Sequence, residues 1–324
     1  MNVWSRWCLL PTLFMVVCSL ACQSAPPTAA SRLGDIPITA EFRAGLRAIA
    51  ALDPDDKIRN PDTMARQFLS DAFWFWNALD PDYAKSQMFI KAYRVNGYYT
   101  ANASTKHIDA ILEKAAARGF DQVVNIGSEL DSRPYRFRER MPAVRFFELD
   151  LPATVACKKE LVAAALGGLP ENVRYIPVDY RGGAIETPLK QAGYDAQKRT
   201  LFICEDALRY IDGAAVERVF EFIAANAAAG SELVFDYIPA EIVHGDFSKY
   251  PRARFHSIRM AAYGHPWKFG IAMGKAADFV TARGLNMVSD LGAGELAQRY
   301  LVRKDGQIDG QPTAYFRIMH AVLK

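Results

Sequence analysis

The chain has 324 residues, of which 51% are hydrophobic, 23% charged and 12% aromatic. This composition supplies enough apolar material for a core and excludes disordered, collagen-like and coiled-coil chains. Lysine and arginine total 39 against 36 aspartates and glutamates, so the net charge is only +3. No concentrated basic stripe points to nucleic acid as a partner.

The first 22 residues have the layout of a secretory signal. Arg6 precedes an almost continuous apolar stretch over residues 7–20, and small residues follow it, which is the order found in export signals. The stretch is short for a membrane-spanning helix and is interrupted by Pro11. Because Ser19-Leu20-Ala21-Cys22 resembles a bacterial lipoprotein box, we expect export or membrane attachment through Cys22; without either, the protein would be cytoplasmic.

Two further segments precede the main domain. Residues 23–37 are rich in alanine, serine and proline and are expected to form a tether. Residues 38–118 show apolar residues at helix spacing. Asp62 is placed to cap one of these helices, and Gly119 is placed to end the last one. We therefore predict a helical cap over residues 38–118.

From residue 119 onward strands alternate with helices, which predicts a doubly wound, mostly parallel α/β domain over residues 119–324. The variable segment near 239–270 is expected to be a lid that carries specificity. The final apolar run, residues 314–323, is expected to return as an antiparallel edge strand. The other β-type runs lie at residues 122–126, 144–149, 173–178, 200–204, 232–236 and 285–289.

Polar residues follow the predicted strands at the edge where ligands of such sheets bind. Gly127 follows the first strand, and a glycine lets a ligand approach the backbone closely. Asp150 ends the second strand, where a carboxylate can accept hydrogen bonds from both hydroxyls of a ribose. The third strand ends in Asp179 and Tyr180, suited to an adenine amino group and ring, and the fourth ends in Glu205, followed by Tyr210.

The glycine pattern argues against a phosphate-bearing cofactor. A GxGxxG loop would need glycines where Glu129 and Ser132 stand, and a carboxylate beside a pyrophosphate would be repulsive. An adenosine cofactor without phosphates fits better, which indicates S-adenosylmethionine (SAM) and disfavours a nicotinamide-dependent dehydrogenase. Cys157 and Cys204 have no CxxC partner or histidine cluster, so no metal site is expected.

Three stretches resemble the leucine carboxyl methyltransferase family. The similarity covers roughly Lys91 to Tyr237 and implies SAM as the cofactor. It also implies the class I SAM-dependent methyltransferase fold, a Rossmann-like sheet of seven strands with the last strand antiparallel. The stretches are Gln122–Phe137 (QVVNIGSELDSRPYRF), Glu148–Pro152 with Lys158 and Lys159 after it, and Glu205 with Tyr210-Ile211.

The resemblance implies a set of site residues at the matching positions. They are Gly127, Asp131 and Arg133 in the loop after the first strand, Asp150 at the ribose, Asp179 and Tyr180 at the adenine, and Glu205 facing the methionine part of SAM, with Tyr210 as its catalytic neighbour.

Two positions depart from the family pattern. Glu129 stands where the family has its second glycine, which puts a large charged side chain beside the cofactor loop. Ser104 stands where the family often has an arginine that grips the SAM carboxylate. Loss of such a charge-assisted hydrogen bond costs roughly 1.5–3 kcal/mol, and Lys91, Arg94 or Lys106 could substitute.

These features predict an O-methyltransferase that uses SAM to methylate a carboxylate or hydroxyl of a small molecule or peptide. A carboxylate acceptor needs no base, whereas a hydroxyl acceptor needs one. The alternative is a catalytically decayed binding protein on the same scaffold, exported or lipid-anchored, which the two departures and the signal-like start would explain. The candidate bases are His107, His244, His256 and His265.

Overall fold

The computed structural model describes residues 38–324, apart from residues 71–72, 74–79, 81 and 94. At its centre is a sheet of seven strands: β1 (Gln122–Ile126), β2 (Arg145–Asp150), β3 (Val173–Pro177), β4 (Thr200–Cys204), β5 (Glu232–Tyr237), β6 (Leu285–Gly292) and β7 (Arg317–Leu323). Their order across the sheet is β3-β2-β1-β4-β5-β7-β6. Strands β1 to β5 pair in parallel, and β7 runs antiparallel to β5 and β6. The predicted fold class is confirmed.

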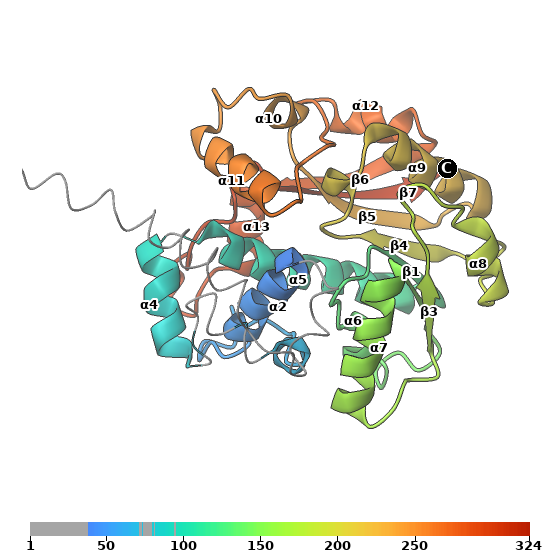
Figure 1. Cartoon of the computed structure of the whole chain (residues 1–324), viewed down its shortest axis with the longest axis horizontal. Coiled ribbons are helices and arrows are strands. Elements are labelled where there is room, and N and C mark those ends of the chain that lie inside the picture. Colours follow the sequence, from blue (N-terminus) through green and yellow to red (C-terminus); the bar gives the residue numbers. More distant parts are fainter. Residues whose placement is uncertain (1–37, 71–72, 74–79, 81, 94) are drawn as a thin grey trace, which may run out of the picture.

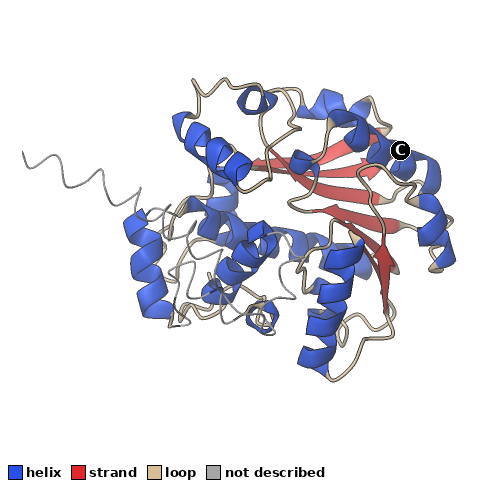
Figure 2. Cartoon of the chain, viewed as in Figure 1, coloured by secondary structure: helices blue, strands red, loops and turns tan. Residues whose placement is uncertain are grey.

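Helices cover both faces of the sheet (Figures 1 and 2). All residues of β1 and β4 are buried, as expected for parallel strands covered on both faces. Because successive side chains of a strand alternate, Leu201 and Ile203 join one core cluster while Phe202 and Cys204 join the other. The first cluster includes residues of α2 (Ile38–Ala50), α5 (Asn96–Ala117), α7 (Pro152–Leu166) and α13 (Ala293–Tyr300), and the second includes residues of α8 (Glu186–Gln191), α9 (Gly213–Asn226) and α12 (Ala276–Thr281).

Polar caps and glycines set several of the helix ends. The carboxylate of Asp62 accepts the N–H of Ala65 at 3.0 Å, but the element that follows is a short 3-10 helix, η3 (Ala65–Phe68), and the residue at its N-cap position is Met64. The prediction that Asp62 caps a helix is therefore wrong in its position. Gly119 after α5 and Gly167 after α7 have φ values of 83° and 76°. This left-handed conformation, which glycine adopts without a steric penalty, ends both helices.

The prediction that the final strand lies at an edge of the sheet is wrong. Strand β7 lies between β5 and β6 and pairs with both. Helix α13, which the sequence analysis did not predict, follows directly on β6 and carries the chain back, so that β7 can insert beside β5. An apolar run shows that a strand is buried but does not identify its neighbours.

The remaining helices lie in the amino-terminal part of the chain and in the connections that follow β1, β4 and β5. The segment near 239–270, predicted as a lid, contains helices α10 (Ala240–Val243) and α11 (Pro251–Ala262). Its role as a lid stays a prediction. None of the helices in the described part of the chain is long and apolar enough to cross a membrane. The signal-like segment 1–22 and the tether 23–37 lie outside the described residues. The remaining helices are α4 (Tyr83–Tyr93), α6 (Arg133–Arg136), η4 (Leu208–Tyr210), α10 (Ala240–Val243) and α11 (Pro251–Ala262).

Candidate functional site

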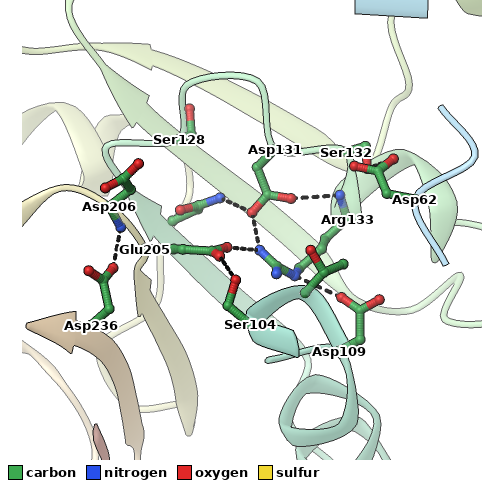
Figure 3. Close-up of polar contacts among 12 residues, drawn as sticks. Asp62, Ser104, Asp109, Ser128, Asp131, Ser132, Arg133, Glu205, Asp206 and Asp236 are labelled. Atoms are coloured by element: carbon green, nitrogen blue, oxygen red, sulfur yellow. Dashed lines mark hydrogen bonds and ion pairs between the residues drawn. The ribbon is translucent and has the colours of Figure 1, made fainter. Parts of the chain in front are cut away.

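Three of the predicted cofactor residues, Asp131, Arg133 and Glu205, meet beyond the carboxyl ends of β1 and β4 (Figure 3). Together with Gly127 they line a cavity beside helix α2. The loop after β1 and the end of β4 face α2 across a cavity of about 20 Å³, which has room for about one water molecule. The side chains and backbone that line it include Arg43, Arg47, Gly127, Glu129, Asp131, Arg133, Glu205 and Asp206.

Gly127 occupies a position that only glycine fits. Its φ is +73°, and a Cβ built there would lie 2.7 Å from the Cβ of Ala207 and 3.0 Å from the hydroxyl of Tyr180. The N–H of Gly127 donates to the carbonyl of Leu149 at 2.9 Å, which ties the loop to the end of β2. The absence of a side chain therefore lets Ala207 and the hydroxyl of Tyr180 pack against the loop backbone.

Asp131, Arg133 and Glu205 form one buried network. Nη1 of Arg133 donates to Asp131 Oδ2 at 2.7 Å and to Glu205 Oε2 at 2.8 Å, while its Nε donates to Asp109 Oδ1 at 2.8 Å. Asp131 also accepts a hydrogen bond from the side-chain amide of Asn125 at 2.8 Å. Arg133 is only 3% exposed. Its guanidinium links three acids that come from different parts of the chain: Asp109, Asp131 and Glu205.

The acids of this network stay ionised at neutral pH. Burial by itself raises the pKa of Glu205, but Arg133 and Arg43 more than offset it and lower that pKa to about 2. Burial also opposes ionisation of Asp131, yet Arg133 and Lys158 hold its pKa well below the usual range. Asp131 and Glu205 are therefore ionised carboxylates beside the cavity, each paired with an arginine.

Asp150 is 4% exposed and lies beside the loop that follows β1. Its Oδ2 accepts the N–H of Glu129, and its Oδ1 accepts the N–H of Leu151, both at 2.7 Å. Glu129 has a left-handed φ of +35° and lines the cavity. Burial, followed by the neighbouring charge of Asp150, raises the pKa of Glu129 to about 8. The departure at Glu129 therefore adds little negative charge at pH 7.

Tyr180 contacts the loop after β1, whereas Asp179 is exposed to solvent. The hydroxyl of Tyr180 lies against the loop after β1, and burial raises its pKa well above the ordinary value. Asp179 is exposed and forms an ion pair with Arg181 at 2.7 Å. Asp179 and the half-buried Tyr210 do not line the cavity, and neither do Asp150 and Tyr180. The roles assigned to all the predicted site residues stay predictions.

Arg43 of α2, which the sequence analysis missed, completes the network. Its Nη2 donates to Glu205 Oε1 at 2.6 Å, and its Nη1 lies 3.0 Å from Asp206 Oδ2. Ser104 donates to the same Glu205 oxygen at 2.8 Å and lies 3.5 Å from Nη2 of Arg43. A guanidinium is thus present beside Ser104, but it comes from another helix. Arg43 and Glu205 are 162 positions apart, and no local pattern joins them.

The cations proposed from the sequence as substitutes do not take this place. Nζ of Lys106 donates to the backbone carbonyls of Lys57 and Tyr300, each at 3.2 Å. Lys91 is exposed on α4, and Arg94 lies outside the described residues. The suggestion of Lys91 or Lys106 is corrected, because the guanidinium beside Ser104 belongs to α2.

Two further acids lie next to Glu205. Asp206 follows β4 with a φ of +60°, and Asp236 is the second-last residue of β5. The N–H of Asp206 donates to Asp236, and Nη1 of Arg209 donates to Asp236 Oδ2 at 2.6 Å. Non-glycine residues in this conformation cost of order 1–3 kcal/mol and cluster at functional sites. The rule that ligands bind at strand ends could have identified Asp236 from the sequence.

The four candidate histidines do not line the cavity. His107 and His256 are each hydrogen-bonded through Nδ1 to a tyrosine hydroxyl, at 2.8 and 2.6 Å. Burial lowers the pKa of each to about 4. His244 and His265 lie in the segment predicted as a lid. The described residues contain no group of three or more histidine, cysteine, aspartate or glutamate side chains that could hold a metal ion.

Comparison with known proteins agrees with this geometry. A family model described as leucine carboxyl methyltransferase matches residues 40–224. A proposed SAM-dependent methyltransferase of Mycolicibacterium vanbaalenii is 31% identical over 211 residues, which cover 64% of this chain and 68% of that protein. Another, from Mycolicibacterium gilvum, is 32% identical over 224 residues, which cover 65% of this chain and 68% of that protein.

A solved structure shows the same fold. The crystal structure of a duf574 family protein from Streptomyces avermitilis superposes with a TM-score of 0.54 at 15% identity, covering 76% of this chain and 92% of that one. The family match spans more than half of this chain, and the two relatives are matched over 68% of their length. The chain therefore belongs to the leucine carboxyl methyltransferase family of SAM-dependent methyltransferases.

Proposed function

We propose that this protein transfers a methyl group from SAM to an oxygen nucleophile, a carboxylate or a hydroxyl, of a small molecule or a peptide. The observation that carries the proposal is the buried network of Asp131, Arg133 and Glu205, which lies with Asp150 at the carboxyl edge of the sheet. SAM, when bound, supplies a methyl group on a positively charged sulfur.

The residues at the strand ends fit the chemistry of SAM. A carboxylate has about four acceptor positions, and backbone N–H groups occupy two of those on Asp150, leaving two for ribose hydroxyls. Gly127 lines the cavity, and a glycine lets a ligand approach the backbone closely. The ionised Glu205 would attract the ammonium and sulfonium charges. Tyr180 is proposed to pack against the adenine.

The space between α2 and the strand ends must widen to admit SAM. Ligand sites for molecules of this size occupy roughly 300 Å³ or more, against about 20 Å³ in this structure. Glu129 and helix α2 form walls of this space, and they are the parts proposed to move.

The acceptor decides whether a base is needed. Methylation of a carboxylate requires no proton transfer, and positioning and exclusion of water can supply most of the acceleration. A hydroxyl must lose its proton. Asp206, which lines the cavity next to Glu205, is proposed to take that proton, with Tyr210 on η4 as the predicted catalytic neighbour.

Calorimetric titration with SAM and with its demethylated product tests the proposal. Absence of binding by either at millimolar concentration would contradict it and would favour a non-catalytic protein on the same scaffold. Asp150→Ala is expected to weaken SAM binding by about 1–3 kcal/mol through loss of hydroxyl hydrogen bonds. Asp150→Asn, which keeps the side-chain shape, repeats the test in a milder variant.

Asp179 provides the comparison for Asp150. It also follows a strand and is the predicted contact of the adenine amino group, but it is exposed and paired with Arg181. A change of less than about 0.5 kcal/mol in the free energy of SAM binding by Asp179→Ala would show that this pair keeps it from the cofactor, whereas a loss of about 1–3 kcal/mol would support the adenine contact. Equal losses in the Asp150 and Asp179 variants would show that burial in the site does not select the ligand residue.

Export or lipid attachment through Cys22 is proposed from the sequence of the first 22 residues. Cell fractionation with amino-terminal sequencing of the mature protein tests it. A mature cytosolic protein that retains Met1 would contradict the proposal.

A further inference from the structure

Four arginines line the cavity, and Arg43 differs from the others in its exposure. The side chains of Arg47, Arg133 and Arg136 are 10%, 3% and 9% exposed, and that of Arg43 is 13% exposed. Of the two acids paired with Arg43, Asp206 is 4% exposed and Glu205 is 12% exposed. Arg43 and Glu205 both line the cavity, and each keeps part of its side chain exposed.

This pair has the charges that an α-amino-acid group requires. The methionine end of SAM carries an ammonium and a carboxylate on one carbon, so its site needs an anion and a cation side by side. Nη2 of Arg43 and Oε1 of Glu205 are 2.6 Å apart. A guanidinium has five N–H donors, and the contacts of Arg43 with Glu205, Asp206 and Ser104 use at most three of them.

We propose that Arg43 of α2 binds the α-carboxylate of SAM. This assignment rests on the proposed function, because it names a ligand residue for the same cofactor. Ser104 makes room for it: the short side chain on α5 donates to Glu205 and leaves the space beside it to the guanidinium, 3.5 Å away. The charge that α5 lacks at this position is supplied by α2.

Two ligands that differ only in the carboxylate test the assignment. Calorimetry compares SAM with decarboxylated SAM on the full chain. The wild-type protein is expected to prefer SAM roughly tenfold to a hundredfold, the range of a charge-assisted hydrogen bond. Arg43→Ala is expected to bind both ligands alike, because its effect is confined to the carboxylate. Retention of the wild-type preference by Arg43→Ala would overturn the assignment.

A relocated arginine gives the second readout. In Arg43→Ala/Ser104→Arg the guanidinium returns from α5 to the same place, so part of the preference for SAM is expected to return. The same preference in the double variant as in Arg43→Ala would contradict the proposal that this place receives the carboxylate. Arg66→Ala, which removes an exposed arginine from η3, is the matched control and is expected to keep the full preference.

Two controls distinguish loss of the Arg43 contact from misfolding and from failure of the proposed function. Thermal melting checks each variant, and Arg43→Gln, which keeps an N–H donor for Glu205 but no charge, replaces Arg43→Ala if the latter does not fold. Failure of the wild-type protein to bind SAM would remove the proposed function and this assignment together. Wild-type binding with an unchanged preference in Arg43→Gln would remove only the role of Arg43.

Discussion

Glu129 places a carboxyl in a left-handed backbone position beside the cavity. Burial raises its pKa from an ordinary 4.5 to about 8, so the folded state holds the proton more tightly than the unfolded state. The stability this provides is complete below about pH 4.5 and is lost as the pH rises through 8. Glu129→Gln removes the titration.

We therefore expect the Tm of the wild-type protein, relative to that of Glu129→Gln, to fall between pH 5 and pH 8.5. Glu148, whose pKa burial raises to about 7, titrates in both proteins, so the difference isolates Glu129. Parallel pH profiles of the two proteins would contradict the assignment of the raised pKa.

Alanine substitutions at Gly127 and Gly167 distinguish the cost of backbone strain from the cost of a steric clash. Both have positive φ values, 73° and 76°, but a Cβ at Gly127 would meet Ala207 at 2.7 Å, whereas nothing lies within 4 Å of one at Gly167. Gly167→Ala is expected to cost about 1–2 kcal/mol, and Gly127→Ala a further 1–3 kcal/mol from overpacking. Urea denaturation measures both, and equal costs would mean that the loop yields to the added methyl group.

Asp62 fastens α2 to the rest of the fold. Its carboxylate accepts hydrogen bonds from Arg47 Nε on α2 at 2.8 Å and from the hydroxyl of Ser132 at 2.6 Å, and it is 1% exposed. Asp62→Ala leaves the buried guanidinium of Arg47 without a carboxylate and with the carbonyl of Leu130 as its remaining acceptor, so we expect a loss of about 3–5 kcal/mol in the free energy of unfolding, measured in urea.

The control for Asp62 is Asp278→Ala on α12. Its pair with Lys275 is also an ion pair, but both side chains are about 70% exposed, so the expected loss is below about 0.5 kcal/mol. A comparable loss in both variants would show that the anchoring of α2 does not depend on burial.

The elements that the sequence predicts well are those whose signal is local. Strands β1 and β4 begin and end at the predicted residues because polar residues or a glycine bound their apolar runs. Helix α13 was missed, since it begins directly after Gly292, the last residue of β6, with no turn between them. The position of β7 was wrong because pairing partners depend on the whole sheet.

In the candidate site, too, local sequence signals identify some residues, whereas others depend on how the whole molecule packs. Glu205 could be placed because it follows a strand, and parallel strands bring their carboxyl ends together. Asp131 and Arg133 were implied by the resemblance to the methyltransferase family. Arg43 could not be placed, since its contact with Glu205 depends on how α2 packs against the finished sheet. Long-range packing of the amino-terminal helices is therefore what the sequence leaves open.

Entry of SAM is expected to disturb α2. The cavity between this helix and the strand ends has a volume of only about 20 Å³. Binding of SAM at saturation should therefore change the hydrogen–deuterium exchange of the backbone amides of α2. Helix α12, on the opposite face of the sheet, serves as the internal reference and should exchange at an unchanged rate. Identical exchange of α2 with and without SAM would show that the cofactor enters by another route.

The placement of β7 has a consequence for incomplete chains. Because β7 is the only strand joining β5 to β6 within the described sheet, a truncated product without residues 317–323 would leave both of those strands with bare hydrogen-bonding edges. All six residues of β5 are buried in the intact fold, and exposed apolar edges recruit other chains. Such fragments should aggregate rather than persist as a smaller sheet.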